Sequence, residues 1–249
     1  MRMINHHPGR VSATLLGLLP FLLIMLIYSL ASQERLAENP NDKLLPGLEQ
    51  MTAAVERMAF QEDRRSGDYL MVQDTTASLA RLGMGVGIAA LLALVVGILN
   101  GVLPLVRANL APLVSALSMV PPLAILPILF IVFGLGELSK VMLIVIGTAP
   151  IMMRDVAQRV RELPGEQLIK IQTLGANSWQ VITRMALPQV LPRLIDAVRL
   201  SLGPAWLFLI AAEAIASTEG LGYRIFLVRR YLAMDVILPY VIWITILAI

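Results

Sequence analysis

Residues 78–103 read SLARLGMGVGIAALLALVVGILNGVL, and this apolar stretch decides the fold of the chain. Crossing the roughly 30 Å hydrocarbon core of a bilayer takes about 20 mostly apolar residues, and soluble cores rarely need such runs. Glycines rather than clusters of charge interrupt the stretch. It therefore predicts a transmembrane helix whose small residues allow close packing against neighbouring helices.

The composition of the whole chain points the same way. Of its 249 residues, 57% are hydrophobic and 15% are charged, whereas soluble domains average about 45–50% and about 25%. The net charge of +3 comes without a Lys/Arg block that is interleaved with aromatic residues, so no nucleic-acid partner is expected. The chain has no Cys, and His6 and His7 lie in the N-terminal tail. Disulfides, thiolate metal sites and a His-dependent site among the helices are therefore excluded.

Further apolar runs predict an all-α, polytopic transmembrane helix bundle with about six transmembrane helices. We expect a cytoplasmic N-terminal tail (1–10), a first transmembrane helix (11–31), an external amphipathic or polar segment (32–77) and a core domain (78–249) with a cytoplasmic loop (154–193). Within the core, helices are expected at 78–103, 110–133, 139–153, 194–212 and 236–249. The last run is too short to cross a bilayer, so we expect its helix to continue beyond residue 249.

The first apolar run could be a cleavable signal peptide or a retained helix. It follows Arg2 and Arg10 but is long for a signal peptide, contains Pro20 and offers only a weak cleavage site, which favours a retained helix. The positive-inside rule favours a cytoplasmic N-terminus. The opposite side is not depleted of basic residues, however, since it carries Arg64, Arg65, Arg81, Arg229 and Arg230.

The polar segment 32–77 contains a second helical pattern. Apolar residues recur at three-to-four spacing, at Leu48, Met51, Val55 and Met58, which predicts an amphipathic helix. The segment could be a lid or docking surface, or a long solvated connection, and the second interpretation is slightly favoured.

Proline marks the run 110–133, which contains Pro112, Pro121, Pro122 and Pro127. Each proline removes a backbone donor and bends or breaks a helix. Inside a membrane such breaks survive only against protein or a water-filled cavity. Pro121 and Pro122 are therefore candidates for lining a substrate path, with a bent packing helix as the alternative.

The segment 164–188 has the local pattern of two short helices around a glycine. Pro164 suits the first turn of a helix and Gly175 its end, while Asn177 or Ser178 can cap a second helix through about Met185. Pro188 then marks the point where the chain enters the membrane again. Glu166 and Lys170 stand at i, i+4, which favours the first helix by a few tenths of a kcal/mol.

This segment resembles the signature loop of ABC importer permeases, in which a glycine is followed by nine residues, Ile, one residue and Leu-Pro. Strings here resemble the nitrate/sulfonate/taurine branch: Leu174-Gly175-Ala176, Trp179-Gln180, Leu187-Pro188, Ala205-Trp206-Leu207, Ala211-Ala212-Glu213 and Glu219-Gly220-Leu221-Gly222-Tyr223. The resemblance extends from about Leu79 to the end. The family pattern also has Glu-Ala-Ala and three further residues before the glycine. This chain departs from the pattern twice, with Ile169-Lys170-Ile171 at the Glu-Ala-Ala positions and Met185 in place of Ile.

The resemblance implies a type I importer permease of the bacterial inner membrane, without catalytic activity of its own. It would move a small anionic solute (a sulfonate, taurine, nitrate or bicarbonate) delivered by an external binding protein. Expected partners are two ABC ATPase subunits that hold ATP and Mg, a second permease copy that forms a homodimer with this chain, and the lipid bilayer. This chain itself would bind no cofactor, because Gly83-x-Gly85-x-Gly87 lies in an apolar helix and is interpreted as packing rather than as a phosphate loop.

The resemblance also implies the residues that couple the chain to the ATPase. We expect the helix over residues 168–178 to dock in a groove of that subunit, with Glu166 in place of the missing signature Glu. The expected coupling residues are Glu166, Leu168, Lys170, Leu174, Gly175, Ala176, Asn177, Ser178, Trp179, Leu187 and Pro188.

Charges inside membranes are costly and are therefore candidates for function. Two ionisable residues are candidates for the substrate path: Arg199 within the run 194–212, and Glu213 at its end. Arg199 could attract an anion, and Glu213 is either functional or paired with a neighbouring helix. A secondary transporter would instead need mid-membrane coupling groups and internal repeats. An intramembrane enzyme would need a cluster of polar catalytic groups. Neither pattern is evident.

Overall fold

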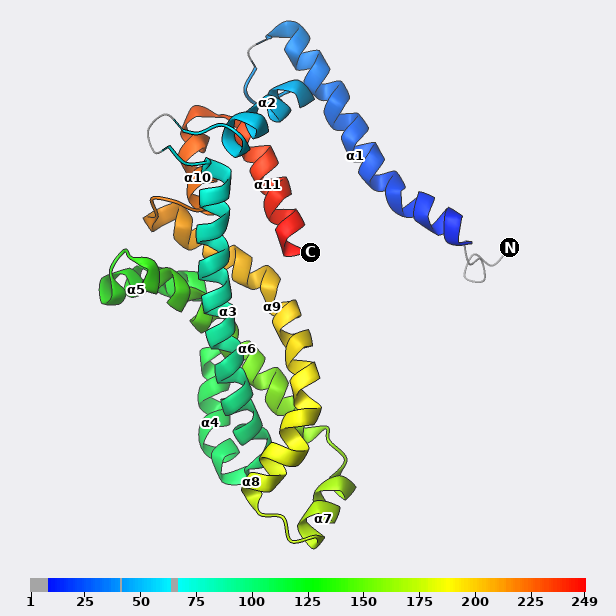
Figure 1. Cartoon of the computed structure of the whole chain (residues 1–249), viewed down its shortest axis with the longest axis vertical. Helices are drawn as coiled ribbons and strands as arrows, with labels where there is room; N and C mark the ends of the chain where they lie inside the picture. The colour runs from blue at the N-terminus through cyan, green and yellow to red at the C-terminus, as the bar shows by residue number, and fades with distance from the viewer. Residues whose placement is uncertain (1–8, 41, 64–66) are drawn as a thin grey trace. The chain divides into compact units, whose positions relative to one another are not determined.

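The computed structural model describes residues 9–40, 42–63 and 67–249, and its regular elements there are all helical (Figure 1). His6, His7, Arg2, Arg64 and Arg65 lie outside the described residues. The helices are α1 (Arg10–Glu38), α2 (Leu48–Ala59), α3 (Leu70–Val102), α4 (Pro104–Leu117), α5 (Leu126–Phe133), α6 (Glu137–Arg161), α7 (Gly165–Thr173), α8 (Ser178–Gln180), α9 (Leu187–Ala216), α10 (Leu221–Val228) and α11 (Met234–Ala248). Short 3-10 turns cover Pro122–Ile125 and Arg229–Tyr231, and a π-helical stretch covers Val181–Ala186.

Among the described residues, 4 helices are long and apolar enough to cross a membrane. They are α1, α3, α6 and the continuous helix Ser178–Ala216. Pro104–Leu117 and Pro122–Phe133 make a fifth span if the bent pair counts as one, and α11 is a shorter apolar helix. The predicted all-α membrane bundle is confirmed.

The chain divides into two compact units, residues 1–69 with 228–243, and residues 70–227 with 244–249. In the first unit, the apolar window of α1 has no buried residue, as expected of a helix that faces lipid. The end of α1 is held to the next segment by Tyr28, whose hydroxyl donates to the Pro46 carbonyl at 2.8 Å, and by the Arg35–Asp42 ion pair at 2.6 Å. The predicted amphipathic helix is α2, which buries Ala54 and Met58.

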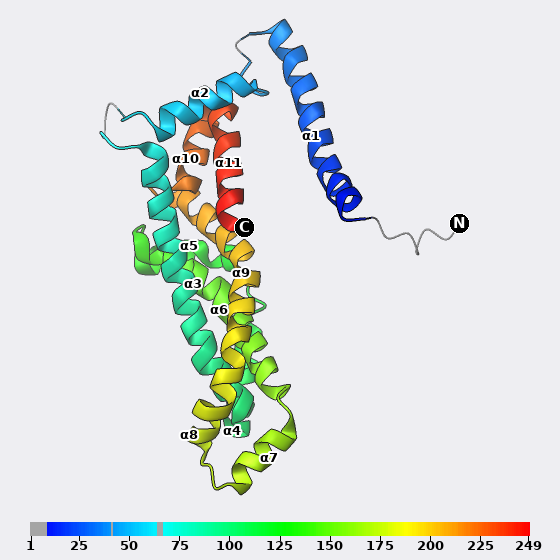
Figure 2. The ribbon, with the colours of Figure 1, turned by 45° about the vertical axis from the view of Figure 1, so that its right-hand side comes forward.

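In the second unit, α3, α6 and α9 lie side by side (Figures 1 and 2). Small residues of α3 recur every four positions along the contact with α6, at Gly85, Ala89, Ala93, Gly97 and Gly101. A Cβ atom at Gly97 would lie only 2.7 Å from the Cβ of Val156, and one at Gly85 2.7 Å from that of Ile144. This row of glycine and alanine therefore sets how closely the two helices approach.

Two glycines of the same helix do not take part in this packing. A Cβ atom at Gly83 or Gly87 would meet nothing within 4 Å. Within this chain, the packing expected of Gly83, Gly85 and Gly87 is found at Gly85. The reason is geometric, since residues two apart on a helix point to different faces.

Several helices extend beyond the apolar runs that predicted them. α1 continues to Glu38, α3 begins at Leu70, and α6 continues to Arg161. Parts of the polar segment 32–77 and of the loop 154–193 are thus helical, because leaving the apolar part of a sequence does not end a helix. The connection expected between residues 212 and 236 also contains a helix, α10.

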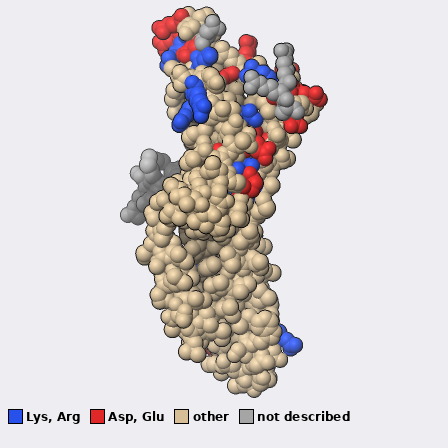
Figure 3. Space-filling model, turned by 90° about the vertical axis from the view of Figure 1, so that its left-hand side faces the viewer, with Lys and Arg blue, Asp and Glu red and all other residues tan. Residues whose placement is uncertain are grey.

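The proline-rich run is broken as predicted. α4 ends at Leu117, a 3-10 turn starts at Pro122, and the two halves are bent by 82°. Pro121 is exposed and Pro122 is half-buried at this corner. In the view of Figure 3, a wide area of the surface shows neither acidic nor basic side chains. Such a surface suits contact with lipid.

Candidate functional site

The 164–188 segment lies at the end of the second unit where α6 finishes and α9 begins. α7 starts directly after Pro164, and Gly175 closes it with a left-handed backbone at φ +84°. The N–H of Gly175 donates to the Gln172 carbonyl at 2.9 Å, and that of Ala176 to the Ile171 carbonyl at 3.2 Å. Glycine adopts this conformation without a steric penalty, so the prediction that Gly175 ends the helix is confirmed.

Asn177 starts the next helix, as predicted. Its side-chain oxygen accepts the Gln180 N–H at 2.9 Å, and the Gln180 side chain accepts the Asn177 N–H at 2.9 Å. This reciprocal capping box satisfies donors that a helix start leaves free. The expected separate second helix is wrong, however, because the chain runs without a break from Ser178 to Ala216. The wider π stretch Val181–Ala186 lies just before Pro188, whose ring would crowd a regular α turn.

The side chains of this segment point largely outwards. No residue of α7 is buried. Leu174 is 79% exposed and Trp179 is 68% exposed. Glu166 and Lys170 are both exposed, and the described residues contain no ion pair between them. The Gln189 side chain donates to that of Gln167 at 3.1 Å and ties α7 to the base of α9.

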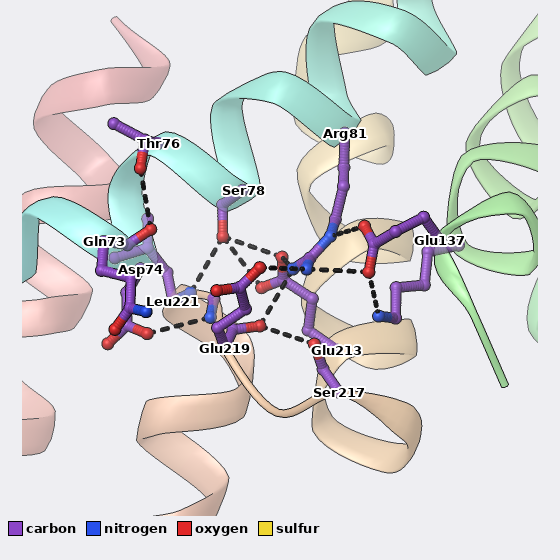
Figure 4. Close-up of polar contacts among 12 residues, drawn as sticks. Gln73, Asp74, Thr76, Ser78, Arg81, Glu137, Glu213, Ser217, Glu219 and Leu221 are labelled. Carbon is purple, nitrogen blue, oxygen red and sulfur yellow. Dashed lines mark hydrogen bonds and ion pairs between the residues drawn. The ribbon is translucent and has the colours of Figure 1, made fainter. Parts of the chain in front are cut away.

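A buried cluster of charges lies where α3 and α6 begin and α9 ends (Figure 4). Its centre is Arg81, which is 2% exposed. The guanidinium donates to the fully buried Glu213 carboxylate at 2.7 Å and to the Glu219 carbonyl at 2.9 Å. It also pairs with Glu137, which Lys140 contacts from the other side at 2.7 Å. Arg81 thereby joins three helices and the loop after α9.

The loop 217–220 and the start of α10 are fixed by the same cluster. Ser78 donates to both oxygens of Glu213 and accepts the Leu221 N–H at 2.9 Å. The Gly222 N–H donates to Glu213 at 2.9 Å. Asp74 accepts the Gly220 N–H at 2.9 Å and pairs with Arg224 at 2.7 Å. A Cβ atom at Gly220, whose φ is +120°, would collide with the Glu213 carboxylate, so glycine is needed there.

This arrangement can hold helices but leaves little capacity for a ligand, because a buried charge needs a partner and hydrogen bonds, and Glu213 has both. The structure thus brings Glu213 together with Arg81 rather than with Arg199, which is exposed on α9. Sequence reasoning singled out Glu213 and missed Arg81 as its partner. The signal that could have found it was spacing. Arg81 stands four positions before Gly85 and so continues the row of small residues along the face of α3 that contacts α6.

Comparison with known proteins places this architecture in one family. Residues 70–249 match the binding-protein-dependent transport system inner membrane components, and the chain belongs to this family. It is a multi-pass inner-membrane permease component, as the sequence resemblance predicted.

Two relatives illustrate the range of the family. The taurine transport system permease protein TauC of Escherichia coli (strain K12) is 38% identical over 182 residues, which are 73% of this chain and 66% of TauC. The chain thus spans slightly less than two thirds of that relative. The bicarbonate transport system permease protein CmpB of Synechococcus elongatus is 31% identical over 217 residues, which are 85% of this chain and 74% of CmpB.

The fold is also found among solved structures. A chain of the MetNI methionine ABC transporter, in an inward-facing conformation, aligns with a TM-score of 0.64 at 22% identity. The match covers 75% of this chain and 93% of that chain. The expected fold class, that of a type I ABC importer permease, is confirmed.

Proposed function

We propose that this chain is the membrane subunit of an ATP-driven importer that receives its solute from an external binding protein. The observation that carries the proposal is the 164–188 segment, an exposed helix and cap between two membrane helices of a family member. In this proposal the segment and the N-terminus face the cytoplasm. Two ABC ATPase subunits hold ATP and Mg, and a second permease copy completes the path as a homodimer.

The solute we propose is a small anion of the sulfonate, taurine, nitrate or bicarbonate class. Relatives named for taurine and for bicarbonate support this range. Both solutes contain an oxyanion group, which an arginine can bind. Arg199 stays a candidate for attracting it, and Pro121 and Pro122 stay candidates for lining the path at the corner between α4 and α5.

Coupling in this proposal is mechanical. α7 with the turn at Gly175 and the exposed Leu174 and Trp179 would dock on the ATPase, and movement of that subunit would displace the segment. The segment is covalently continuous with the long helices α6 and α9, which pack on each other and on α3. Rigid helices transmit such a displacement to the other end of the bundle, where the Arg81 cluster holds the same three elements together.

Replacing Gly175 with alanine tests the coupling role. The left-handed backbone at Gly175 costs a residue with a Cβ about 1–2 kcal/mol, so the turn should relax and α7 should lose its orientation. We expect ATP-driven uptake to fall several-fold while the melting temperature of the purified chain falls by only a few degrees. Uptake into membrane vesicles together with the melting temperature in detergent measures both.

The matched control is Gly165→Ala, which makes the same change in the same segment. Gly165 has no atom within 4 Å of an added Cβ and an ordinary backbone, so uptake should be unaffected. Gly175→Asn should keep more activity than Gly175→Ala, because asparagine tolerates the left-handed region. Equal uptake by the Gly175→Ala and Gly165→Ala variants would contradict a coupling role for this turn.

A further inference from the structure

A polar pocket of about 420 Å³ lies at the end of the second unit where α3 finishes, α4 begins and α6 ends. It is distinct from the Arg81 cluster, which lies where α3 and α6 begin. Arginines dominate its lining: Arg107 from α4, and Arg154 and Arg161 from α6. Asp155 is the acidic residue of the lining, and it pairs with Arg159 at 3.7 Å. The pocket is therefore positively charged.

None of these three arginines has a carboxylate partner among the described residues. Arg107 donates to the carbonyls of Asn100 at 3.1 Å and Gly101 at 2.6 Å, where α3 ends. Arg154 donates to the Ser118 hydroxyl at 2.9 Å, and Arg161 contacts the Gln158 side chain. A guanidinium carries five N–H donors. These contacts leave donors and positive charge available to a ligand in the pocket.

Asn100 supplies an independent observation. It lines the same pocket and is 5% exposed, and its Oδ1 is a buried side-chain atom with no hydrogen-bond partner. A buried acceptor without a partner is costly and rare in native proteins. This oxygen needs a hydrogen-bond donor, and the arginines need an acceptor with negative charge. A ligand that satisfies both has an oxyanion group and a donor close to it.

We propose that this pocket binds an oxyanion that also carries a hydrogen-bond donor, with Arg107 and Arg154 holding the oxyanion and Asn100 accepting from the donor. A zwitterionic aminosulfonate has this chemistry, and so does the phosphoglycerol headgroup of an anionic lipid. Arg199, Pro121 and Pro122 are not among the residues that line this pocket. Its binding requires neither ATP nor a partner protein, so it stands or falls independently of the proposed importer function.

The test has one arm for each source of the oxyanion. In the first, taurine is titrated into the full chain in a nonionic detergent, and binding is followed by calorimetry. In the second, the chain is extracted from vesicles of phosphatidylglycerol and phosphatidylcholine, and retained lipid is identified by native mass spectrometry. Arg154→Gln should weaken the binding seen in at least one arm by about tenfold or more, because it removes a charged hydrogen bond. Arg193→Gln, an exposed arginine outside the pocket lining, is the control.

Asn100→Leu separates a ligand role from a structural one. Its Oδ1 makes no bond in the described structure, so leucine should leave the melting temperature of the ligand-free chain unchanged or higher. Binding should nevertheless weaken by about threefold or more, because the acceptor is lost.

Binding that depends on Arg154 in the taurine arm identifies a free solute as the ligand. Binding that depends on Arg154 in the lipid arm identifies a lipid headgroup. If neither ligand shows binding that depends on Arg154, or if Asn100→Leu lowers stability without affecting binding, the proposal is overturned.

Discussion

Replacing Arg81 with glutamine is expected to lower the free energy of unfolding by about 3–5 kcal/mol, the usual effect of removing one partner of a buried ion pair. Arg81 is 2% exposed and its 2.7 Å partner Glu213 is fully buried. Without the guanidinium, the donors that the described residues still offer the Glu213 carboxylate are Ser78 and the Gly222 N–H. The loop after α9 also loses the bond from Arg81 to the Glu219 carbonyl. Denaturant unfolding of the purified chain in detergent measures the change.

A double-mutant cycle shows whether this loss comes from the pair itself. Glu213→Gln alone should also destabilise, whereas Arg81→Gln with Glu213→Gln leaves neither of these two charges buried. The double variant should therefore be more stable than the sum of the single effects by at least about 1 kcal/mol. Arg230→Gln, at an exposed arginine, is the control and should change stability by less than about 0.5 kcal/mol. Strictly additive effects would mean that the two residues act separately.

The second large effect is expected at Gly97, where α3 and α6 approach each other closely. A Cβ there would lie 2.7 Å from Val156 and 3.0 Å from the Met153 carbonyl oxygen. Backbone cannot yield as a flexible side chain does, so Gly97→Ala must push the helices apart along the small-residue row. We expect a loss of about 1–3 kcal/mol, and a larger loss for Gly97→Leu. Thermal and denaturant unfolding report it.

Gly87→Ala is the matched control, since it makes the same change in the same helix where nothing lies within 4 Å. It should be neutral or stabilising by up to about 1 kcal/mol, because alanine favours helix more than glycine does. Val156→Ala should restore only a small part of the stability lost in Gly97→Ala, because it removes the Cγ1 contact but leaves the Val156 Cβ and the Met153 carbonyl oxygen in place. Equal effects of Gly97→Ala and Gly87→Ala would rule out the close approach of α3 and α6 at Gly97.

The local features of the chain were predictable because their causes are local. The left-handed turn at Gly175 and the cap at Asn177 depend on a few neighbouring residues, and the structure contains both. The break at Pro121 and Pro122 follows from missing backbone donors. Its angle of 82° does not, since that depends on what the two halves pack against.

The buried cluster could not be derived in the same way. Arg81 and Glu213 are 132 positions apart, and hydropathy assigned each of them only to a helix end. A charge near a helix end has several possible partners, and tertiary packing selects one. The predicted helix limits were wrong for a related reason. The length of an apolar run follows the thickness of the bilayer, whereas a helix can continue into the polar residues on either side of that run. α10 was missed because its eight residues lie in a stretch rich in glycine and arginine.

The most direct test of the central claim is uptake into vesicles that contain this chain, its ATPase partner and an external binding protein loaded with radiolabelled taurine. Taurine should accumulate only when hydrolysable ATP is enclosed on the ATPase side, and collapse of the ion gradients should leave the rate unchanged. Accumulation that needs no ATP and stops when the ion gradients collapse would contradict the importer function and establish a secondary transporter instead.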